Sequence, residues 1–186
     1  MYGATKLASE LLVQEYNDMY GLRGFVDRCG VIAGAWQMGK VEQGVVSLWV
    51  AKHLWPGELA YLGFGGAGKQ VRDLLSVDDL YRLVALQMKA MDSINGQVFN
   101  VGGGANFSVS LLELTELCQQ LTGNRVTIGS VEETREGDVP YYVSDCRLLQ
   151  KYIDWEPSKS PQDIVLDVFH WLVANESSVR PILTAV

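Results

Sequence analysis

The 186-residue chain has a hydrophobic content of 48% and a mean hydropathy of +0.07, values typical of a folded globular protein rather than a disordered one. Its formal net charge of -7 argues against nucleic acid and anionic membrane surfaces as partners. No apolar run approaches the roughly 20 residues that a membrane-spanning helix needs, and the amino terminus does not resemble a signal peptide. The three cysteines and two histidines lack metal-binding spacing, so we expect reduced thiols, a cytoplasmic location and no metal site.

The first third of the chain predicts two helices with a strand between them. Residues 4–20 read as a helix that Gly21 ends. Residues 25–32 read as one buried strand, followed by a loop. A second helix is expected to begin near Gln43 and to end at the Pro56-Gly57 pair.

The remaining two thirds alternate short strands with helices. Asp78 or Asp79 is expected to cap a helix, and Ser110 with Glu113 forms a capping box for the helix that ends at Gly123. Residues 177–186 are expected to be loosely held. The other expected elements are strands at 59–64, 70–77, 98–101, 126–128 and 141–143, and helices at 80–91, 145–152 and 161–176. This alternation predicts an α/β fold without an internal linker.

The segment Gly63–Gly68 formally matches the dinucleotide-binding pattern G-x-G-x-x-G. Such a loop works only when a helix starts directly behind it, so that the helix amides face a phosphate. The following residues 69–77 have the apolar pattern of a strand, and Gln70 stands where a triphosphate loop needs Ser or Thr. We therefore interpret the glycines as a turn between strands.

Tyr2 and Lys6 are the most informative pair in the sequence. Their spacing puts them one turn apart on one face of a helix. An ammonium beside a phenol favours the phenolate, the form that can act as a base. The spacing alone also fits an ordinary helical pair with no chemical role.

Several segments resemble the extended short-chain dehydrogenases, and within them the NAD-dependent nucleotide-sugar epimerases and dehydratases. They are YGATKLASELLVQEYNDMYGL, FVDRCGVIAG, GKQVRDLLSVDDL, GQVFNVGGG, REGD at 135–138 and DWEP at 154–157. The resemblance implies part of a Rossmann-like sheet together with the family's small carboxy-terminal substrate domain. The family's first half, with its glycine-rich NAD loop, does not occur within these 186 residues. We therefore expect residues 1–186 to form a single compact unit, equivalent to a carboxy-terminal half.

The resemblance also implies roles for individual residues. Tyr2 would be the catalytic base, and Lys6 would hold the nicotinamide ribose of NAD, so that both would contact the cofactor. Arg72 would reach the pyrophosphate of a nucleotide-diphosphate sugar, with a surface ion pair as the alternative explanation. Arg135 and Asp138 would bind phosphate and ribose.

Gln43 precedes a helix start that could face the diphosphate, in a stretch similar to that of the CDP-tyvelose 2-epimerase type. Val31 departs from the family, many of whose members carry Asn at this position. An apolar side chain cannot donate a hydrogen bond to a phosphate, so a substrate contact here would have to be made by the backbone or be lost.

Two functions remain open at this stage. The chain could be a truncated epimerase or dehydratase that keeps part of the nucleotide-sugar site but neither binds NAD nor turns over substrate alone. Alternatively, it could be a non-enzymatic binding or assembly module that pairs with a separate amino-terminal half. A third possibility, without a function of its own, is an inactive remnant that oligomerisation stabilises. In either case the exposed apolar helix and the open strand edge within residues 4–32 predict a homo-oligomer, most simply a dimer.

Overall fold

The computed structural model describes residues 1–39, 43–55 and 57–184, which alternate helices and strands. The helices are α1 (Tyr2–Tyr20), α2 (Val45–Leu54), α3 (Val77–Lys89), α4 (Met91–Ile94), α5 (Leu111–Thr122), α6 (Arg147–Gln150), α7 (Pro161–Ala174) and α8 (Glu176–Thr184). The strands are β1 (Val26–Cys29), β2 (Val31–Ala33), β3 (Leu59–Leu62), β4 (Val71–Ser76), β5 (Val98–Val101), β6 (Ser108–Ser110), β7 (Ile128–Val131) and β8 (Tyr141–Tyr142).

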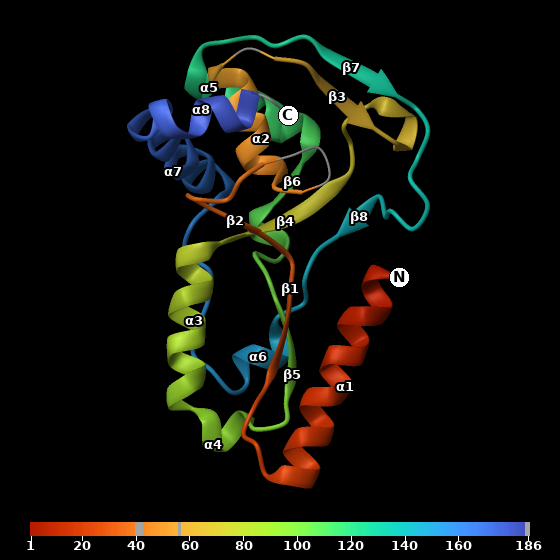
Figure 1. Ribbon diagram of the computed structural model, residues 1–186, viewed down its shortest axis with the longest axis vertical. Helices are drawn as coiled ribbons and strands as arrows, with labels where there is room; N and C mark the ends of the chain where they lie inside the picture. The colour runs from red at the N-terminus through yellow and green to blue at the C-terminus, as the bar shows by residue number, and fades with distance from the viewer. Residues whose placement is uncertain (40–42, 56, 185–186) are drawn as a thin grey trace.

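Strand β4 has the most partners. It pairs in parallel with β2 and β8 and antiparallel with β6. The other two pairs, β1 with β5 and β3 with β7, are parallel. In Figure 1, β1 and β5 run through the lower half beside α3 and α6, whereas β3 and β7 arch over the upper half near α2 and α5. The strands therefore form three small sheets, with β4 at the junction of the two halves.

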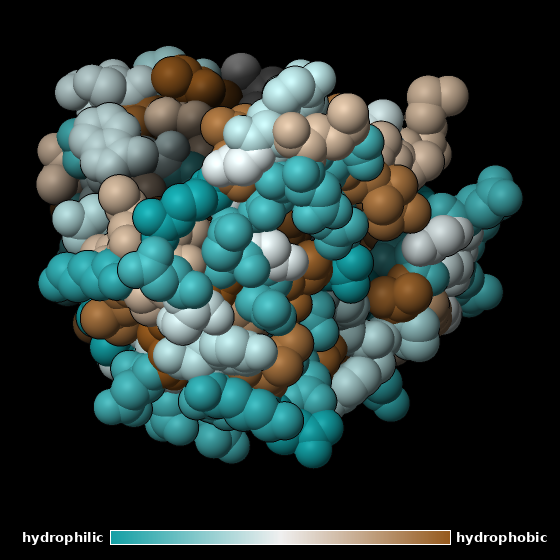
Figure 2. Space-filling model, turned by 90° about the horizontal axis from the view of Figure 1, so that it is seen from below, coloured by the Kyte–Doolittle hydropathy of each residue, from teal (hydrophilic) through white to brown (hydrophobic). Residues whose placement is uncertain are grey.

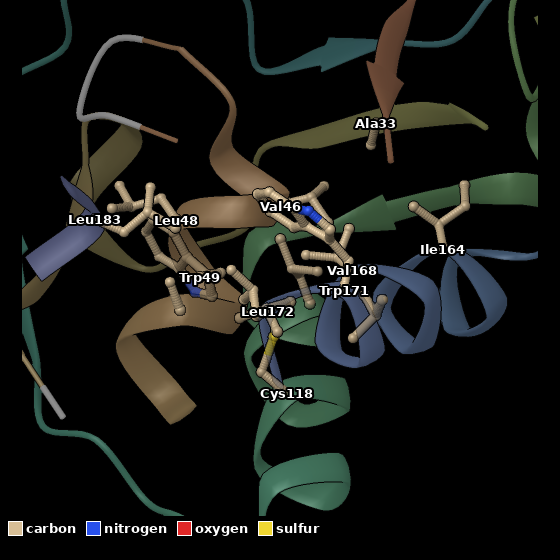
Figure 3. Close-up of a cluster of buried hydrophobic side chains, with 14 of the residues drawn as sticks. Ala33, Val46, Leu48, Trp49, Cys118, Ile164, Val168, Trp171, Leu172 and Leu183 are labelled. Carbon is tan, nitrogen blue, oxygen red and sulfur yellow. The ribbon is translucent and has the colours of Figure 1, made fainter. Parts of the chain in front are cut away.

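The larger hydrophobic core lies among α2, α5, α7 and α8. Figure 3 shows Trp49, Cys118, Val168 and Leu172 converging from these elements. The high apolar content of α2 is explained by its position between α5 and α7, where eight consecutive residues from Val46 to His53 are buried.

The smaller hydrophobic core fills the lower half. It consists of Leu75, Leu83, Ile94, Phe99, Val101, Leu149, Ile153 and Trp155. Leu74, the neighbour of Leu75 on β4, belongs instead to the larger core. Successive side chains of a strand point to opposite faces of its sheet, so β4 contributes to both cores at once.

Most of the expected elements are present. Helix α1, strand β5 and the capping box of Ser110 and Glu113 match the expectation, and Gly21 and Gly123 adopt the left-handed conformation at the two helix ends. Gly123 has a φ of 71°, which a residue with a Cβ adopts only at a cost.

The prediction of one strand over residues 25–32 is wrong. The chain forms β1 and β2 on either side of Gly30, and these pair with different strands, β5 and β4. A Cβ at Gly30 would lie 3.0 Å from the Asp73 carboxylate and 3.1 Å from the Ser144 hydroxyl oxygen. The strand therefore changes partner where a glycine allows close approach.

Two expectations, one about the start of a helix and one about the carboxy-terminal residues, are also wrong. Helix α3 begins one turn earlier than expected, because Ser76 caps it by accepting a hydrogen bond from the amide of Asp78. The expectation that residues 177–186 are loosely held is wrong for residues 177–184, which belong to α8, where Val179 and Leu183 are buried in the larger core. Residues 185–186 lie outside the described residues.

Candidate functional site

Tyr2 and Lys6 lie on the first turn of α1. The Lys6 Nζ atom is 5.3 Å from the centroid of the Tyr2 ring, within the range of a cation–π contact. Tyr2 is 74% exposed, and Figure 1 shows this end of α1 standing clear of the rest of the molecule. The two side chains are thus adjacent and open to an approaching group.

Helix α1 is attached to the rest of the chain by polar contacts. Arg28 donates two hydrogen bonds to the Glu10 carboxylate, at 2.9 and 2.7 Å, and this interaction lowers the pKa of Glu10. Asn17 donates to the side chain of Asn95 at 2.7 Å. None of the residues of α1 is buried.

A cavity of about 1170 Å³ opens between α2, β3, β4 and the start of α5. Its apolar walls come from Val45, Leu48 and Trp49 on α2, Leu59 and Leu62 on β3, Leu74 on β4, and Val109, Leu111 and Leu114 around the start of α5. Charged side chains reach it from Lys52, Glu58, Arg72, Arg125, Arg135 and Asp138. A concave, largely apolar site with a few charged groups is the usual form of a small-molecule site.

Arg72, Arg135 and Asp138 all line this cavity, although they come from β4 and from the loop before β8. The Arg72 Nη2 atom donates to the Asp138 carboxylate and to the Val139 carbonyl, both at 2.8 Å. Arg72 therefore also forms an ion pair, the alternative role that the sequence left open for it, and its partner is Asp138. Gly137, at a φ of 80°, turns the loop between Arg135 and Asp138.

Three predicted site residues, Tyr2, Lys6 and Gln43, are not among the described residues that line the cavity. Tyr2 and Lys6 lie on α1, apart from it, whereas Gln43 lies near its edge. It is exposed and lies two residues before Val45, which does line it.

The Gly63–Gly68 loop packs against β7 and leads into β4 rather than into a helix. The Ser130 hydroxyl donates to the carbonyl of Gly66 at 3.0 Å, and the Thr134 hydroxyl accepts from the amide of Phe64 at 2.8 Å. A Cβ at Gly66 would lie 1.9 Å from the Ser130 hydroxyl oxygen. These glycines allow close packing between segments, as expected for a turn leading into a strand.

One buried carboxylate that the sequence analysis did not single out, that of Asp73, holds the site in place. Asp73 is fully buried, and its Oδ2 atom accepts from the amides of Gly104 and Ser144 at 3.0 and 3.1 Å. It thereby fixes the strand that carries Arg72. The only signal of Asp73 in the sequence is an acid inside a segment that is expected to form a strand.

Four residues of the cavity were also missed: Trp49, Lys52, Glu58 and Arg125. Trp49 and Lys52 share one face of α2 with Val45 and Leu48, the i, i+3, i+4, i+7 spacing that could have indicated a common surface. Within the described ranges no group of His, Cys, Asp and Glu could hold a metal ion, and no helix is long and apolar enough to cross a membrane.

Known proteins are similar to this chain in sequence. The model of the NAD dependent epimerase/dehydratase family matches residues 1–102. CDP-paratose 2-epimerase of Salmonella typhi is 30% identical over 172 residues, which cover 91% of this chain and 51% of the relative. UDP-glucuronate 4-epimerase of Thermodesulfobacterium geofontis is 25% identical over 181 residues, which cover 97% of this chain and 53% of the relative.

The fold agrees with that of solved relatives. The crystal structure of UDP-glucose 4-epimerase with UDP-glucose from Thermotoga maritima matches with a TM-score of 0.80 and 27% identity, over 94% of this chain and 54% of that chain. The chain therefore spans about half the length of the relatives that it matches. It has the α/β architecture of Rossmann-type epimerases, with part of their sheet and their smaller domain. Because the family model matches more than half of its 186 residues, the chain belongs to the NAD-dependent epimerase/dehydratase family.

Proposed function

We propose that residues 1–186 form the nucleotide-sugar-binding part of an NAD-dependent epimerase or dehydratase. The observation that carries this proposal is the convergence of Arg72, Arg135 and Asp138 on one apolar-walled cavity. Arginine pairs with phosphate oxygens through two parallel hydrogen bonds, so two arginines at the rim suit a diphosphate.

The three side chains have different roles in this proposal. Asp138 holds Arg72 through its Oδ1 atom, so that the guanidinium is oriented before a ligand arrives. Arg135, which is exposed, closes on a phosphate from the loop. The second carboxylate oxygen of Asp138 accepts a ribose hydroxyl. Gln43 contributes only at the edge, since it stands outside the cavity lining.

Tyr2 and Lys6 form the catalytic pair in this proposal. The Lys6 ammonium lies 5.3 Å from the centroid of the Tyr2 ring, and in this proposal the Tyr2 phenol is the base that removes a proton from a sugar hydroxyl. NAD, if it were bound, would supply the hydride acceptor and donor at the sugar carbon that bears this hydroxyl. Tyr2 and Lys6 suit the nicotinamide ribose, but the Gly63–Gly68 loop offers no helix start for the diphosphate of NAD. Residues 1–186 alone are therefore proposed to bind nucleotide sugar without turnover.

Isothermal titration with CDP-, UDP- and dTDP-glucose tests the proposed site. Arg135→Ala is expected to weaken binding by about 10- to 100-fold, because a hydrogen bond to a charged group contributes roughly 1.5–3 kcal/mol. Arg72→Ala should act in the same direction. Arg147→Ala is the matched control, because Arg147 pairs with Asp145 and stands outside the cavity. Unchanged affinity in both cavity variants would place the ligand elsewhere.

A second function, assembly, has its own support in α1. Its large apolar side chains are exposed, among them Leu7 at 52%, Leu11 at 57% and Leu12 at 59%. Figure 2 shows that hydrophobic side chains also lie uncovered between hydrophilic ones on the face seen from below. Exposed apolar surface of this kind is typical of an interface. A second copy of the chain or a separate amino-terminal half would cover it, and a dimer through residues 4–32 is the simplest arrangement.

A further inference from the structure

The connection between β7 and β8 runs along the outer edge of the molecule (Figure 1) and is held at two points. The Thr134 hydroxyl accepts a hydrogen bond from the amide of Phe64 at 2.8 Å. The Pro140 carbonyl accepts one from the amide of Val71 at 2.9 Å. Residues 135–139, which we call the strap, therefore bridge two fixed points.

The strap is a single turn that faces solvent. The Asp138 amide donates to the carbonyl of Arg135 at 3.1 Å, and the Val139 amide donates to the Asp138 carboxylate at 2.9 Å. Gly137, at a φ of 80°, allows the chain to turn between them. All five residues of the strap are exposed. These local hydrogen bonds keep the shape of the turn but do not attach it to the cavity.

Arg72 attaches the strap to the cavity wall. Within the described part of the chain, the hydrogen bonds between the strap and other segments all come from the Arg72 Nη2 atom. They go to the Asp138 carboxylate and to the Val139 carbonyl, both at 2.8 Å. The Nη1 atom donates to the carbonyl of Val71 on its own strand, also at 2.8 Å. The arginine at the proposed diphosphate end of the cavity thus also holds the strap.

These contacts leave Arg72 without a complete edge for a phosphate group. A guanidinium has five N–H groups, and each of its two bidentate edges includes one hydrogen of Nη2. Nη2 makes two hydrogen bonds to the strap, which engage both of its hydrogens. A phosphate can therefore take a bidentate edge only if Asp138 or Val139 is released. The strap and the phosphate compete for the same nitrogen atom.

We propose that a diphosphate releases the strap when it binds Arg72, and that the released turn lets Arg135 follow the phosphate. This inference rests on the proposed nucleotide-sugar site and adds a conformational step to it. Without ligand, Asp138 keeps the Arg72 guanidinium in place. A phosphate shifts this arrangement because it forms its bidentate contact only with the released arginine. The pairing of β8 with β4 lies beyond the strap and stays unchanged, so the movement is confined to the turn.

Calorimetric titration with inorganic pyrophosphate tests this competition, because pyrophosphate has no ribose for Asp138 to bind. Asp138→Asn keeps the shape of the side chain but removes its charge, so that Arg72 is held more weakly. Pyrophosphate should then bind about tenfold more tightly than to the unmodified protein. Glu136→Gln is the matched control, because it removes one negative charge from the same strap at a residue outside the cavity lining. Its affinity should change by less than about twofold.

Hydrogen exchange at the amides of Asp138 and Val139 tests the attachment without any ligand. Arg72→Ala removes the described hydrogen bonds that hold the strap, so both amides should exchange at least about fivefold faster. Arg147→Ala is the control, because Arg147 pairs with Asp145 instead. Exchange rates that Arg72→Ala leaves unchanged would overturn the proposal.

The titrations also separate this proposal from the function on which it rests. If UDP and pyrophosphate bind the unmodified protein but Asp138→Asn gives no gain for pyrophosphate, only the strap release fails. An equal gain in Glu136→Gln overturns it too, since the effect would then be one of overall charge. If neither UDP nor pyrophosphate binds the unmodified protein, the proposed function fails and the strap release with it.

Discussion

Asp79 joins the first turn of α3 to the segment that precedes α7. Its buried carboxylate accepts from the amides of Ser158 and Lys159, both at 3.0 Å, and from the Ser158 hydroxyl at 2.7 Å. Arg82 donates to it as well, at 2.5 Å. Asp79→Ala is expected to cost about 2–4 kcal/mol in the free energy of unfolding, because it leaves several donors without an acceptor.

Urea unfolding measures this cost, with Asp92→Ala as the control. The Asp92 side chain is 96% exposed in its ion pair with Arg23, so its removal should change the free energy of unfolding by under about 0.5 kcal/mol. An equal effect of the two substitutions would contradict the anchoring role of Asp79.

The same carboxylate predicts a pH dependence. Burial pushes the pKa of Asp79 up, but the hydrogen bonds from Ser158, Lys159 and Arg82 outweigh it, so its folded-state pKa lies below the usual value. A lowered folded-state pKa contributes stability that is present above the unfolded value of about 3.9 and is lost as the pH falls through the folded value. The difference in free energy of unfolding between the unmodified protein and Asp79→Asn should therefore shrink as the pH falls from about 5 to about 2.

At the scale of residues, the sequence predicts a residue of the cavity only where the family resemblance marks its position. Arg72, Arg135 and Asp138 could be singled out because they occur in recognisable segments, and they do line one cavity. Lys52 and Glu58 could not be singled out in this way, because their places in the cavity wall depend on how α2 ends and on how the chain enters β3 beside it. The sequence predicts Asp78 or Asp79 only as a helix cap, since spacing alone does not reveal from which distant amides a carboxylate accepts hydrogen bonds.

Helix α8 contributes side chains to the larger core, although the sequence predicts a loosely held tail for these residues. Leu183 is fully buried in the larger core, whereas the preceding residue, Ile182, is 52% exposed. Leu183→Ala is expected to lower the free energy of unfolding by about 2–5 kcal/mol, and Ile182→Ala by under about 0.5 kcal/mol. Thermal melts of the two variants distinguish an anchored helix from a frayed end, for which both changes would have equally small effects.

Strand boundaries were the least predictable elements, for a physical reason. Residues 25–32 are largely apolar apart from Asp27 and Arg28, and nothing in that pattern marks the point where the pairing changes from β5 to β4. The break at Gly30 is set by Asp73 and Ser144, which come from far along the chain. Helices with local end signals were easier, because Ser110, Glu113 and Gly123 fix both ends of α5 within one segment.

At the scale of the whole chain, NAD binding separates the proposed part-enzyme from a complete one. Residues 1–186 are expected to show no rise in melting temperature with NAD or NADH up to millimolar concentration. A ligand present at about 100 times its Kd would add about 2.7 kcal/mol of stability, which a thermal melt detects easily. A concentration-dependent rise that Gly65→Ala abolishes would show instead that the glycine loop binds the cofactor. The position is open to a Cβ, but its φ of 76° strains an alanine there, so a melt of the variant without ligand is needed as the control for its fold.

Self-association is the second whole-molecule prediction. Light scattering at micromolar concentration should give at least twice the mass of 20.6 kDa for one chain. Leu11→Glu combined with Leu12→Glu should reduce that mass or the solubility, and because both side chains are exposed in the single chain its fold should survive. Leu166→Glu on α7, a comparably placed exposed leucine outside α1, is the control. A protein that remains monomeric at all concentrations would contradict the assembly proposal.

Strand β4 also limits how this chain can vary in length. Leu74 and Leu75 are neighbours, yet each belongs to a different core. Gaining or losing one residue within the strand would turn both side chains to the wrong side, so that each core would lose its own leucine in the same event. Substitutions that keep the volume of either side chain are far milder. Insertions and deletions are therefore confined to the connections around β4, and the spacing from Arg72 to Asp79 stays fixed even where the residues between them change.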